Sequence, residues 1–382
     1  MNRIIKFGGS VLTDADSLYK AASIIRAYRG RRVVVCSALR GVTSTLCKTL
    51  SPDEWDPIRM RDTLIREKEK HLALLNSLGP STQRHRTERE ITRLVEETLT
   101  RLLLFSQPCS PDATAFVPLL GERLSALLMQ NYLEEQGTPA SLLLPEEIPL
   151  ITDEKSPYVR IDLSGSGANL GASSQKAPVA LVPGFYALHP SGGPRLLGRG
   201  GSDYTAAALG YLLDADSVDL WKDVEGFFSG DPRELPDAVL KNHLNYEEAA
   251  ELSYYGAHIL HPETIPPLRA KKIPLRLFSF TTSFSPESRH TLIDGAGGET
   301  TESITGIAST DNIGIITVGG SDVGSEPGIL ARLTGRLTGG GINIKSVMTS
   351  QTSINILVEA GDLETAHEIL GEESSSGRLV TY

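Results

Sequence analysis

Short apolar runs alternate with helical spacing along the first part of the chain. The run at 3–7 predicts a strand, and the following segment places Leu18, Ala22 and Ile25 on one face of a helix. Residues 31–38 then form a second apolar run. Continuous apolar strands joined by a helix are typical of a parallel sheet that helices cover on both faces. The pattern therefore predicts an α/β fold.

Similar elements are predicted further along the chain. Charges recur around apolar positions between 53 and 104, where glycine and proline are scarce, and this predicts two or three surface helices. A further helix is predicted to start near Gly121, and a polar loop or lid rich in Gly and Ser to span 155–178. Strands are then predicted at 179–188, at 215–228, where the strand runs into a loop, and at 273–280, where the last strand closes the first domain.

A polar stretch, DGAGGETTES, marks the boundary between a first domain at 1–298 and a second domain at 303–382. The second domain reads as strand, helix, two strands, helix and strand, and Pro327-Gly328 opens its first helix. This βαββαβ order describes a small ferredoxin-like module with its own core. Such a module serves as a dimerisation element or as a small-molecule sensor, and the two interpretations are compatible.

Composition and charge exclude several classes of function. The chain has 382 residues and a formal net charge of -10, which argues against a nucleic-acid surface. No apolar stretch reaches the length of a membrane span and the N-terminus lacks the pattern of a signal peptide, so we expect a cytoplasmic protein. Cys36, Cys47 and Cys109 lack the spacing of a zinc site and are predicted to be buried thiols.

Two glycine-rich turns, KFGGSV and GRGGSDYTA, lie where a strand leads into a helix. Backbone N–H groups in such turns point at an anion, and the dipole of the following helix adds to the attraction. The pair therefore indicates two places that hold phosphate or carboxylate groups. The sequence lacks the Walker motif, the protein-kinase motifs and the G-x-G-x-x-G of dinucleotide-binding folds.

Several motifs, taken in order, resemble those of the aspartate kinases: KFGGSV, VCSALRGVTS, GERLSA, VPGF, LGRGGSDYTAAALG, WKDVEGFFSGDPR and SYYGAHILHPETIPPLRAKKIPL. Many amino-acid and phosphate kinases share the first motif, whereas GRGGSD, DVEGFFSGDPR and GAHILHP together are specific to aspartate kinases. The resemblance covers nearly the whole chain. It implies a three-layer αβα sandwich followed by an ACT domain, and transfer of the γ-phosphoryl group of ATP to the side-chain carboxylate of L-aspartate.

The resemblance also implies roles for individual residues of the substrate site. Lys6 corresponds to the lysine that cradles the transferring phosphate, and Asp203 to the carboxylate that orients this lysine. Arg199 corresponds to the residue that binds a substrate carboxylate through a forked pair of hydrogen bonds. Glu122 corresponds to the partner of the substrate ammonium group, although by itself it reads as a helix-start charge. The rest of the implied aspartate pocket is Ser37, Thr43, Gly200, Gly201 and Ser202.

A nucleotide site is implied in the same way. Its residues are Lys6, Gly8, Gly9, Ser10, Lys222, Asp223, Phe228, Arg233 and His258. Lys222 stands where many relatives have Thr, Phe228 where Tyr is usual, and His258 where a lysine often contacts the phosphates. Lys222 is therefore a candidate for the missing positive charge. No cluster of Asp, Glu and His resembles a metal site, so Mg²⁺ is expected to arrive with ATP and to be held mainly by its phosphates.

The second domain departs from the usual aspartate kinase, because the sequence has room for one ACT module where relatives carry two. One module can pair with that of another chain, so we expect a homodimer. The effector stays open between lysine, threonine, another amino acid and none.

Two other functions remain as alternatives. One is a related kinase that acts on another amino-acid carboxylate, such as glutamate or acetylglutamate; GRGGSD, GERLSA and the ACT-like tail argue against it. The other is a non-catalytic amino-acid sensor with a decayed nucleotide site, against which the intact Lys6, Arg199, Asp203 and Glu122 argue.

Overall fold

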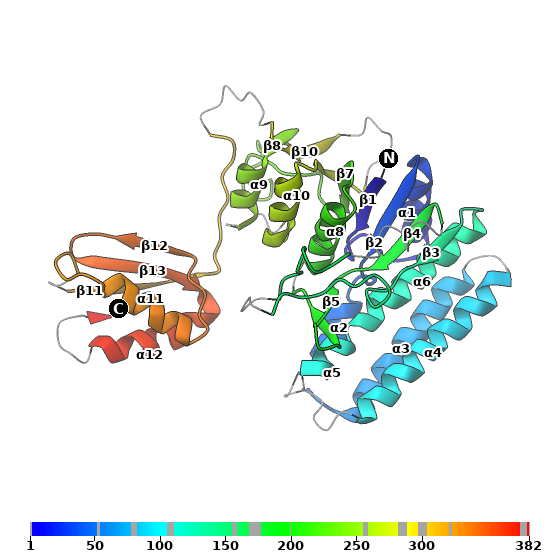
Figure 1. The fold of residues 1–382 in the computed structure, drawn as a ribbon, viewed down its shortest axis with the longest axis horizontal. Helices are drawn as coiled ribbons and strands as arrows, with labels where there is room; N and C mark the ends of the chain where they lie inside the picture. The colour runs from blue at the N-terminus through cyan, green and yellow to red at the C-terminus, as the bar shows by residue number, and fades with distance from the viewer. Residues whose placement is uncertain are drawn as a thin grey trace. The chain divides into compact units, whose positions relative to one another are not determined.

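The chain forms two compact units, Met1–Ala308 and Ser309–Tyr382 (Figure 1). Each unit has its own hydrophobic core. The computed structural model describes residues 2–51, 54–77, 82–104, 111–154, 159–167, 177–198, 200–254, 259–281, 289–296, 304–320, 323–374 and 380–381.

An eight-stranded sheet forms the centre of the first unit. Its strands lie in the order β3 (Ala140–Leu142), β4 (Val179–Pro183), β2 (Arg31–Cys36), β1 (Asn2–Phe7), β7 (Ser217–Lys222), β9 (Leu275–Ser279), β10 (His290–Asp294) and β8 (His243–Asn245). Neighbouring strands run parallel except β9 and β10, which are antiparallel. The prediction that the strand at 273–280 closes the domain was wrong. The missed strand, β10, is short and only alternately buried, so its apolar signal in the sequence is weak.

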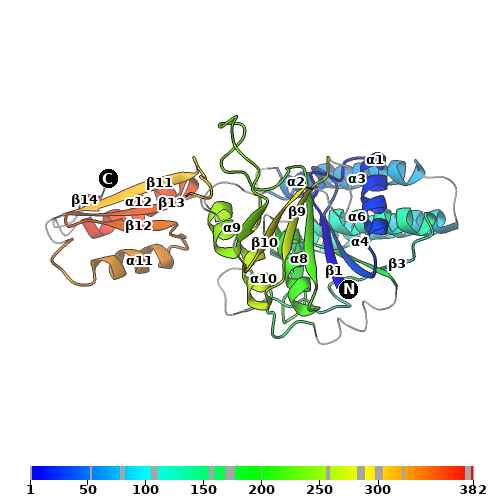
Figure 2. The ribbon, with the colours of Figure 1, turned by 90° about the horizontal axis from the view of Figure 1, so that it is seen from above.

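Helices cover both faces of this sheet, as Figure 2 shows. Alternation along β1 sends Ile4 to one face and Ile5 to the other. The helices on the Ile5 side are α1 (Ala15–Ala27), α2 (Val42–Lys48), α3 (Pro57–Asn76), α4 (Thr82–Leu104) and α6 (Leu119–Glu135), which the short α5 (Pro111–Phe116) precedes. The helices on the Ile4 side are α8 (Gly201–Leu212), α9 (Tyr246–Leu252) and α10 (Ile265–Lys271), with the 3₁₀ turn η2 (Pro262–Thr264) before α10. The predicted αβα sandwich is confirmed.

The strand predicted at 179–188 is interrupted. It breaks at Gly184 and Phe185 into β4 and β5 (Tyr186–Leu188), and Phe185 has a φ of 78°. Strand β5 then pairs antiparallel with β6 (Pro194–Leu196). The apolar sequence hides this break, because a bulky aromatic residue rarely adopts a positive φ.

The cysteines only partly follow the prediction of buried thiols. Cys36 is buried on β2, whereas Cys47 is exposed, and Cys109 lies outside the described residues. Helix α2 is short and buries Val42 and Leu46, so the next position, Cys47, turns away from the core.

The second unit has the predicted βαββαβ order. Its elements are β11 (Ile313–Gly319), α11 (Ile329–Gly339), β12 (Ser346–Thr349), β13 (Ser353–Glu359), the 3₁₀ turn η3 (Ala360–Asp362), α12 (Leu363–Ser374) and β14 (Val380–Thr381). The strands form an antiparallel sheet in the order β12-β13-β11-β14. Ile316 and Ile356 of this sheet pack with Leu333 of α11 and Leu370 of α12. This is the ferredoxin-like topology.

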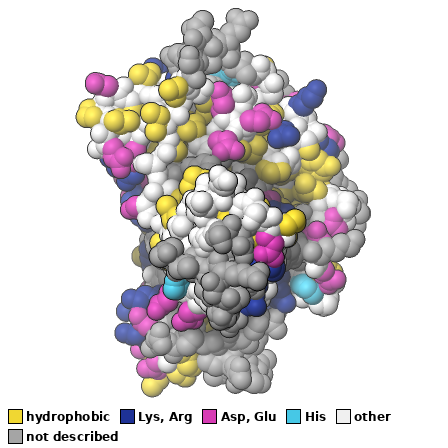
Figure 3. All heavy atoms as spheres, turned by 90° about the vertical axis from the view of Figure 1, so that its left-hand side faces the viewer, with side chains coloured by type: hydrophobic (Ala, Val, Ile, Leu, Met, Phe, Trp, Pro, Cys, Tyr) yellow, Lys and Arg dark blue, Asp and Glu magenta, His cyan; other side chains and the backbone are white. Residues whose placement is uncertain are grey.

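Charged side chains are mixed on the surface. On the face drawn in Figure 3, the described Lys and Arg side chains lie among Asp and Glu side chains rather than in a continuous basic patch. Each helix in the described ranges is too short or too polar to cross a membrane.

Candidate active site

Two lysines reach the same face of the sheet from neighbouring strands. Strands β1 and β7 pair in parallel with Lys6 opposite Leu220, so Lys222 faces the same side as Lys6. Both lie near the carboxyl ends of their strands, the edge at which open α/β sheets bind ligands. Their side chains are only 7% and 15% exposed, respectively, so both ammonium groups are largely removed from water.

Asp203 lies between these two ammonium groups. It is in the first turn of α8, whose N-cap residue Gly200 has a φ of 74°, a left-handed conformation that favours glycine. Lys6 Nζ lies 2.6 Å from Asp203 Oδ1, and Lys222 Nζ donates to Oδ2 at 2.6 Å. Burial by itself would raise the pKa of Asp203, but Lys222 and Lys6 outweigh it and hold the pKa at about 2. The carboxylate is therefore ionised at neutral pH and fixes both lysines.

The cluster of Lys6, Asp203 and Lys222 carries an excess of positive charge. Burial lowers the pKa of Lys6, whereas the neighbouring Asp203 opposes that shift. Lys222 Nζ also donates to the backbone oxygen of Ile259. Nothing in the sequence points to Ile259, because its contribution is a carbonyl group that every residue has. Two cations beside one carboxylate are suited to neutralising a phosphoryl group.

The glycine-rich turn after β1 approaches this cluster closely. Gly8 N donates to the backbone oxygen of Trp221 at 3.2 Å, which ties the turn to the end of β7. A Cβ on Gly9 would lie 2.8 Å from Ala38 O, and a Cβ on Gly8 would lie 3.5 Å from Lys6 Nζ. The turn therefore depends on glycine at Gly9 and leaves the space beside Lys6 free of a side chain at Gly8.

Glu122 forms a second polar site, in the first turn of α6. Its side chain is buried, with 3% of the residue exposed. Thr43 Oγ1 donates to Oε1 at 3.2 Å, while Oε2 is buried and has no hydrogen-bond partner among the described residues. Burial raises the pKa of Glu122 to about 7, although hydrogen bonds from the backbone and Thr43 oppose the shift. A buried carboxylate oxygen without a partner fits a cationic donor from a ligand.

Close packing brings α6 against the segment that follows β2. A Cβ on Gly121 would lie 2.8 Å from the Ala38 side chain, so the two backbones approach closely only because residue 121 is glycine. Ser37 is buried in the same segment, at the edge where β1 also ends. Ser202 is buried in the first turn of α8, beside Asp203.

Other predicted site residues belong neither to the cluster of Lys6, Asp203 and Lys222 nor to the site around Glu122 in the described part of the structure. Arg199 and His258 lie outside the described residues. The Arg233 side chain is 89% exposed and pairs with Asp231. Phe228 is half-buried, and Asp223 is exposed but close enough to Lys6 to raise the pKa of that lysine.

The described residues offer no metal cage of their own: no three His, Cys, Asp or Glu side chains among them are grouped to hold an ion. Both carboxylate oxygens of Asp203 already face ammonium groups.

Two family profiles match the chain. The profile described as the amino acid kinase family matches residues 1–279, and that of an ACT domain matches residues 308–372. The bifunctional aspartokinase/homoserine dehydrogenase of Buchnera aphidicola is 27% identical over 372 residues, 94% of this chain and 45% of its own length. Aspartokinase 2, chloroplastic, of Arabidopsis thaliana is 29% identical over 383 residues, 94% of this chain and 66% of its own length. The chain thus spans less than half of the first of these relatives.

Solved structures show the same fold. The structure of E. coli aspartokinase III in complex with aspartate and ADP (R-state) matches with a TM-score of 0.83 and 27% identity, covering 100% of this chain and 85% of that one. The same enzyme in complex with lysine and aspartate (T-state) matches with a TM-score of 0.76 and 26% identity, covering 100% and 84%.

Proposed function

Because the chain belongs to the amino acid kinase family and its kinase unit is followed by an ACT domain, we propose that it is an aspartate kinase. It transfers the γ-phosphoryl group of ATP to the side-chain carboxylate of L-aspartate and forms 4-phospho-L-aspartate. One observation carries this proposal. A buried cluster with excess positive charge, Lys6, Asp203 and Lys222, lies close enough to Glu122 for Lys6 to lower the pKa of that carboxyl group.

The reaction needs charge neutralisation more than it needs a general base. The attacking carboxylate of L-aspartate is ionised at neutral pH, so no proton has to be removed from it. Lys6 neutralises the phosphoryl group in transfer, and Asp203 holds Lys6 by the 2.6 Å ion pair. Lys222 supplies the second positive charge in place of the lysine that His258 replaces. Mg²⁺ enters with ATP, held mainly by the phosphates, and neutralises part of their charge.

The amino-acid substrate is bound by charges of both signs. The substrate ammonium group supplies the partner that Glu122 Oε2 lacks. Arg199 receives a substrate carboxylate as a forked pair. Three hydroxyl groups and the backbone of two glycines complete this pocket, from Ser37, Thr43, Ser202, Gly200 and Gly201.

The nucleotide lies along the first glycine-rich turn and the loop after β7. Gly9 and Ser10 offer backbone N–H groups to the phosphates. Gly8, whose N–H is bound to Trp221 O, leaves the space beside Lys6 open for them. Asp223 serves the ribose, Phe228 the base and Arg233 the phosphates, for which Arg233 has to leave its pairing with Asp231. The ADP in the matching E. coli aspartokinase III complex supports ATP as the donor.

The ACT domain is the proposed regulatory and dimerisation element. The lysine in the T-state complex of E. coli aspartokinase III supports an amino-acid effector for this chain as well. The reaction product is an intermediate of amino-acid biosynthesis, and lysine and threonine are the end products of that biosynthesis. Two chains pair through their ACT domains.

The proposed activity is tested with the wild-type chain, Mg-ATP and hydroxylamine, which traps an acyl phosphate as a hydroxamate. L-aspartate is expected to give hydroxamate and ADP in equal amounts, at a rate about 100-fold above L-glutamate or N-acetyl-L-glutamate. Equal or faster turnover of the glutamate compounds would contradict the choice of substrate. Aspartate binding without any turnover would favour a non-catalytic sensor.

A further inference from the structure

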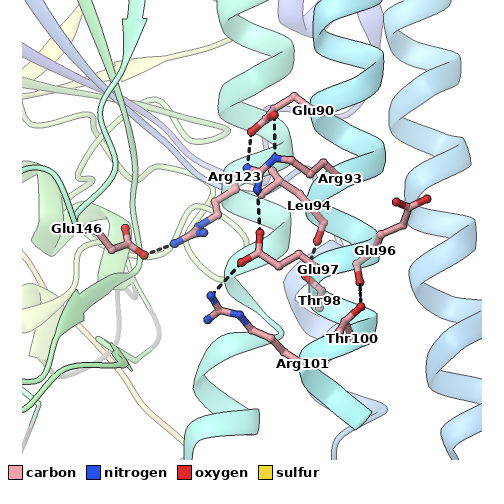
Figure 4. A network of polar contacts seen from close by, with 10 residues as sticks. All are labelled: Glu90, Arg93, Leu94, Glu96, Glu97, Thr98, Thr100, Arg101, Arg123 and Glu146. Carbon is pink, nitrogen blue, oxygen red and sulfur yellow. Dashed lines mark hydrogen bonds and ion pairs between the residues drawn. The ribbon is translucent and has the colours of Figure 1, made fainter. Parts of the chain in front are cut away.

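Arg123, the residue after Glu122, forms a polar group with Tyr186 and Glu146. Arg123 follows Glu122 in the first turn of α6 and extends to Glu146, as Figure 4 shows. Arg123 Nη2 also donates to the Tyr186 hydroxyl at 3.2 Å, and that hydroxyl donates to Glu146 Oε2 at 3.0 Å. Each of the three side chains therefore contacts the other two.

Removing one of these three side chains would leave a buried polar group without its hydrogen-bond partner, which is unfavourable. Tyr186 is fully buried on β5, and the Arg123 side chain is only 13% exposed. Arg123 is the fifth residue of α6, close to the positive end of the helix dipole, and Glu146 compensates for its charge. Helix α6 has no side-chain cap, since its N-cap residue is Pro118. Arg123 therefore secures this end of the helix to Tyr186 and Glu146, in addition to the contacts that the two preceding residues make with the segment after β2.

Strand β5 carries the connection to the other half of the site. The residues just before Tyr186, Gly184 and Phe185, lie against the first turn of α8. A Cβ on Gly184 would lie 2.8 Å from the Ser202 side chain, and a Cβ on Gly201 would lie 3.3 Å from the Phe185 ring. Phe185 N also donates to Thr205 Oγ1 at 3.2 Å.

We propose that Arg123, Tyr186 and Glu146 are positioning residues that hold Glu122 at a fixed distance from the first turn of α8. This inference rests on the proposed function, because it assigns the two ends of L-aspartate to these two turns. The group, which we call the Arg123 strut, connects the turn that carries Glu122 to the turn that carries Ser202 and Asp203. An amino acid that binds through both its charges requires that separation to be constant.

The isosteric variant Tyr186→Phe tests the strut, since it removes one hydroxyl and keeps the buried ring. The Michaelis constant for L-aspartate is expected to rise about tenfold, while that for ATP stays within a factor of two. A merely structural role would lower the active fraction, and with it kcat, without changing the Michaelis constant for aspartate. Tyr132→Phe is the matched control: Tyr132 is a buried tyrosine of α6 whose hydroxyl lies 3.4 Å from Leu74 O, on α3.

A second variant covers the case in which Tyr186→Phe fails to fold. Glu146 is 42% exposed, so Glu146→Ala should leave the fold intact and still raise the Michaelis constant for L-aspartate. Glu146→Gln, which can still accept the tyrosine hydrogen bond, should recover part of the loss. An unchanged constant for L-aspartate in folded Tyr186→Phe and Glu146→Ala would overturn the proposal.

Hydrogen exchange separates failure of the strut from failure of the proposed function. In Tyr186→Phe, the amides at 119–126 and 200–205 should exchange faster, and those at 313–319 should not. If these amides exchange faster but the wild-type chain has no aspartate kinase activity, the proposed function and the assignment to aspartate are overturned. The structural role of the strut would still stand. Unchanged exchange at both turns would overturn the strut whatever the activity.

Discussion

At the scale of single residues, the informative feature is a carboxylate oxygen that is buried and unpaired. Glu122 by itself reads from the sequence as a helix-start charge, which would be solvated. In the structure it is 3% exposed, and no group in the described part of the chain makes a hydrogen bond to Oε2. Only the resemblance pointed to a substrate ammonium group there, because burial at the start of α6 depends on the packing of Gly121 on Ala38.

Aspartate binding is expected to depend on the ionisation of Glu122. Its pKa is raised by burial to about 7, and only the ionised carboxylate pairs with an ammonium group. The dissociation constant for L-aspartate, measured by calorimetry, should therefore rise about tenfold for each pH unit below 7 and level off above it. Glu122→Gln should bind more weakly and show no such dependence. A wild-type constant that is flat between pH 5.5 and 8.5 would contradict the assignment.

The same group predicts the pH dependence of stability without substrate. The pKa of Glu122 in the folded chain, about 7, is above its ordinary value of 4.5, so the folded state binds the proton more tightly than the unfolded state. This contribution to the free energy of unfolding is full below pH 4.5 and is lost as the pH rises through about 7. Glu122→Gln should lack that loss in thermal melts over this window.

At the scale of elements, the register of two strands assembles the proposed phosphate site. The pairing of Lys6 with Leu220 places Lys222 on the same face, and the first turn of α8 then supplies Asp203 between them. Residue spacing cannot show this, because it follows from which strands are neighbours in the sheet.

A substitution at Lys222 tests whether both lysines serve the proposed phosphate site. Lys222→Met removes one of the two cations next to Asp203 and keeps the length of the side chain. The Michaelis constant for ATP is expected to rise by about tenfold or more, and that for L-aspartate to change much less. Lys6 keeps its own ion pair with Asp203 in this variant, so the fold should be retained. A negligible change in the constant for ATP would show that Lys222 only neutralises Asp203.

The sequence predicts well those elements in which the spacing of apolar residues is enough to show which side chains are buried. Strand β1 and helix α1, with Leu18, Ala22 and Ile25 buried, are such cases. The break at Gly184 and Phe185 was missed because it depends on a positive φ at an aromatic residue, which an apolar run does not indicate. Nor could sequence reasoning find Ile259 or the Arg123 strut. Ile259 acts through its backbone oxygen, which every residue has. The Arg123 strut depends on Tyr186, which lies in an apolar run of the sequence and therefore reads as a core residue.

At the scale of the whole molecule, a kinase unit and an ACT unit are joined in one chain, with the division between Ala308 and Ser309. The order of the second unit follows from its sequence alone, because each of its strands and helices is short and separately bounded. The proposed phosphate and aspartate sites both lie within the first unit. Catalysis is therefore proposed as a property of residues 1–308, and regulation and pairing of chains as properties of the second unit.

The most direct test of this account is the rate of aspartyl hydroxamate formation, at saturating Mg-ATP and L-aspartate, in Lys6→Met and in Lys48→Met. Lys6 is buried against Asp203, whereas the Lys48 side chain is 70% exposed and pairs with Glu54. We predict that Lys6→Met loses roughly a thousandfold in rate while folding normally, and that Lys48→Met equals the wild type. A folded Lys6→Met chain that forms hydroxamate within a factor of two of the wild-type rate would contradict the proposed active site.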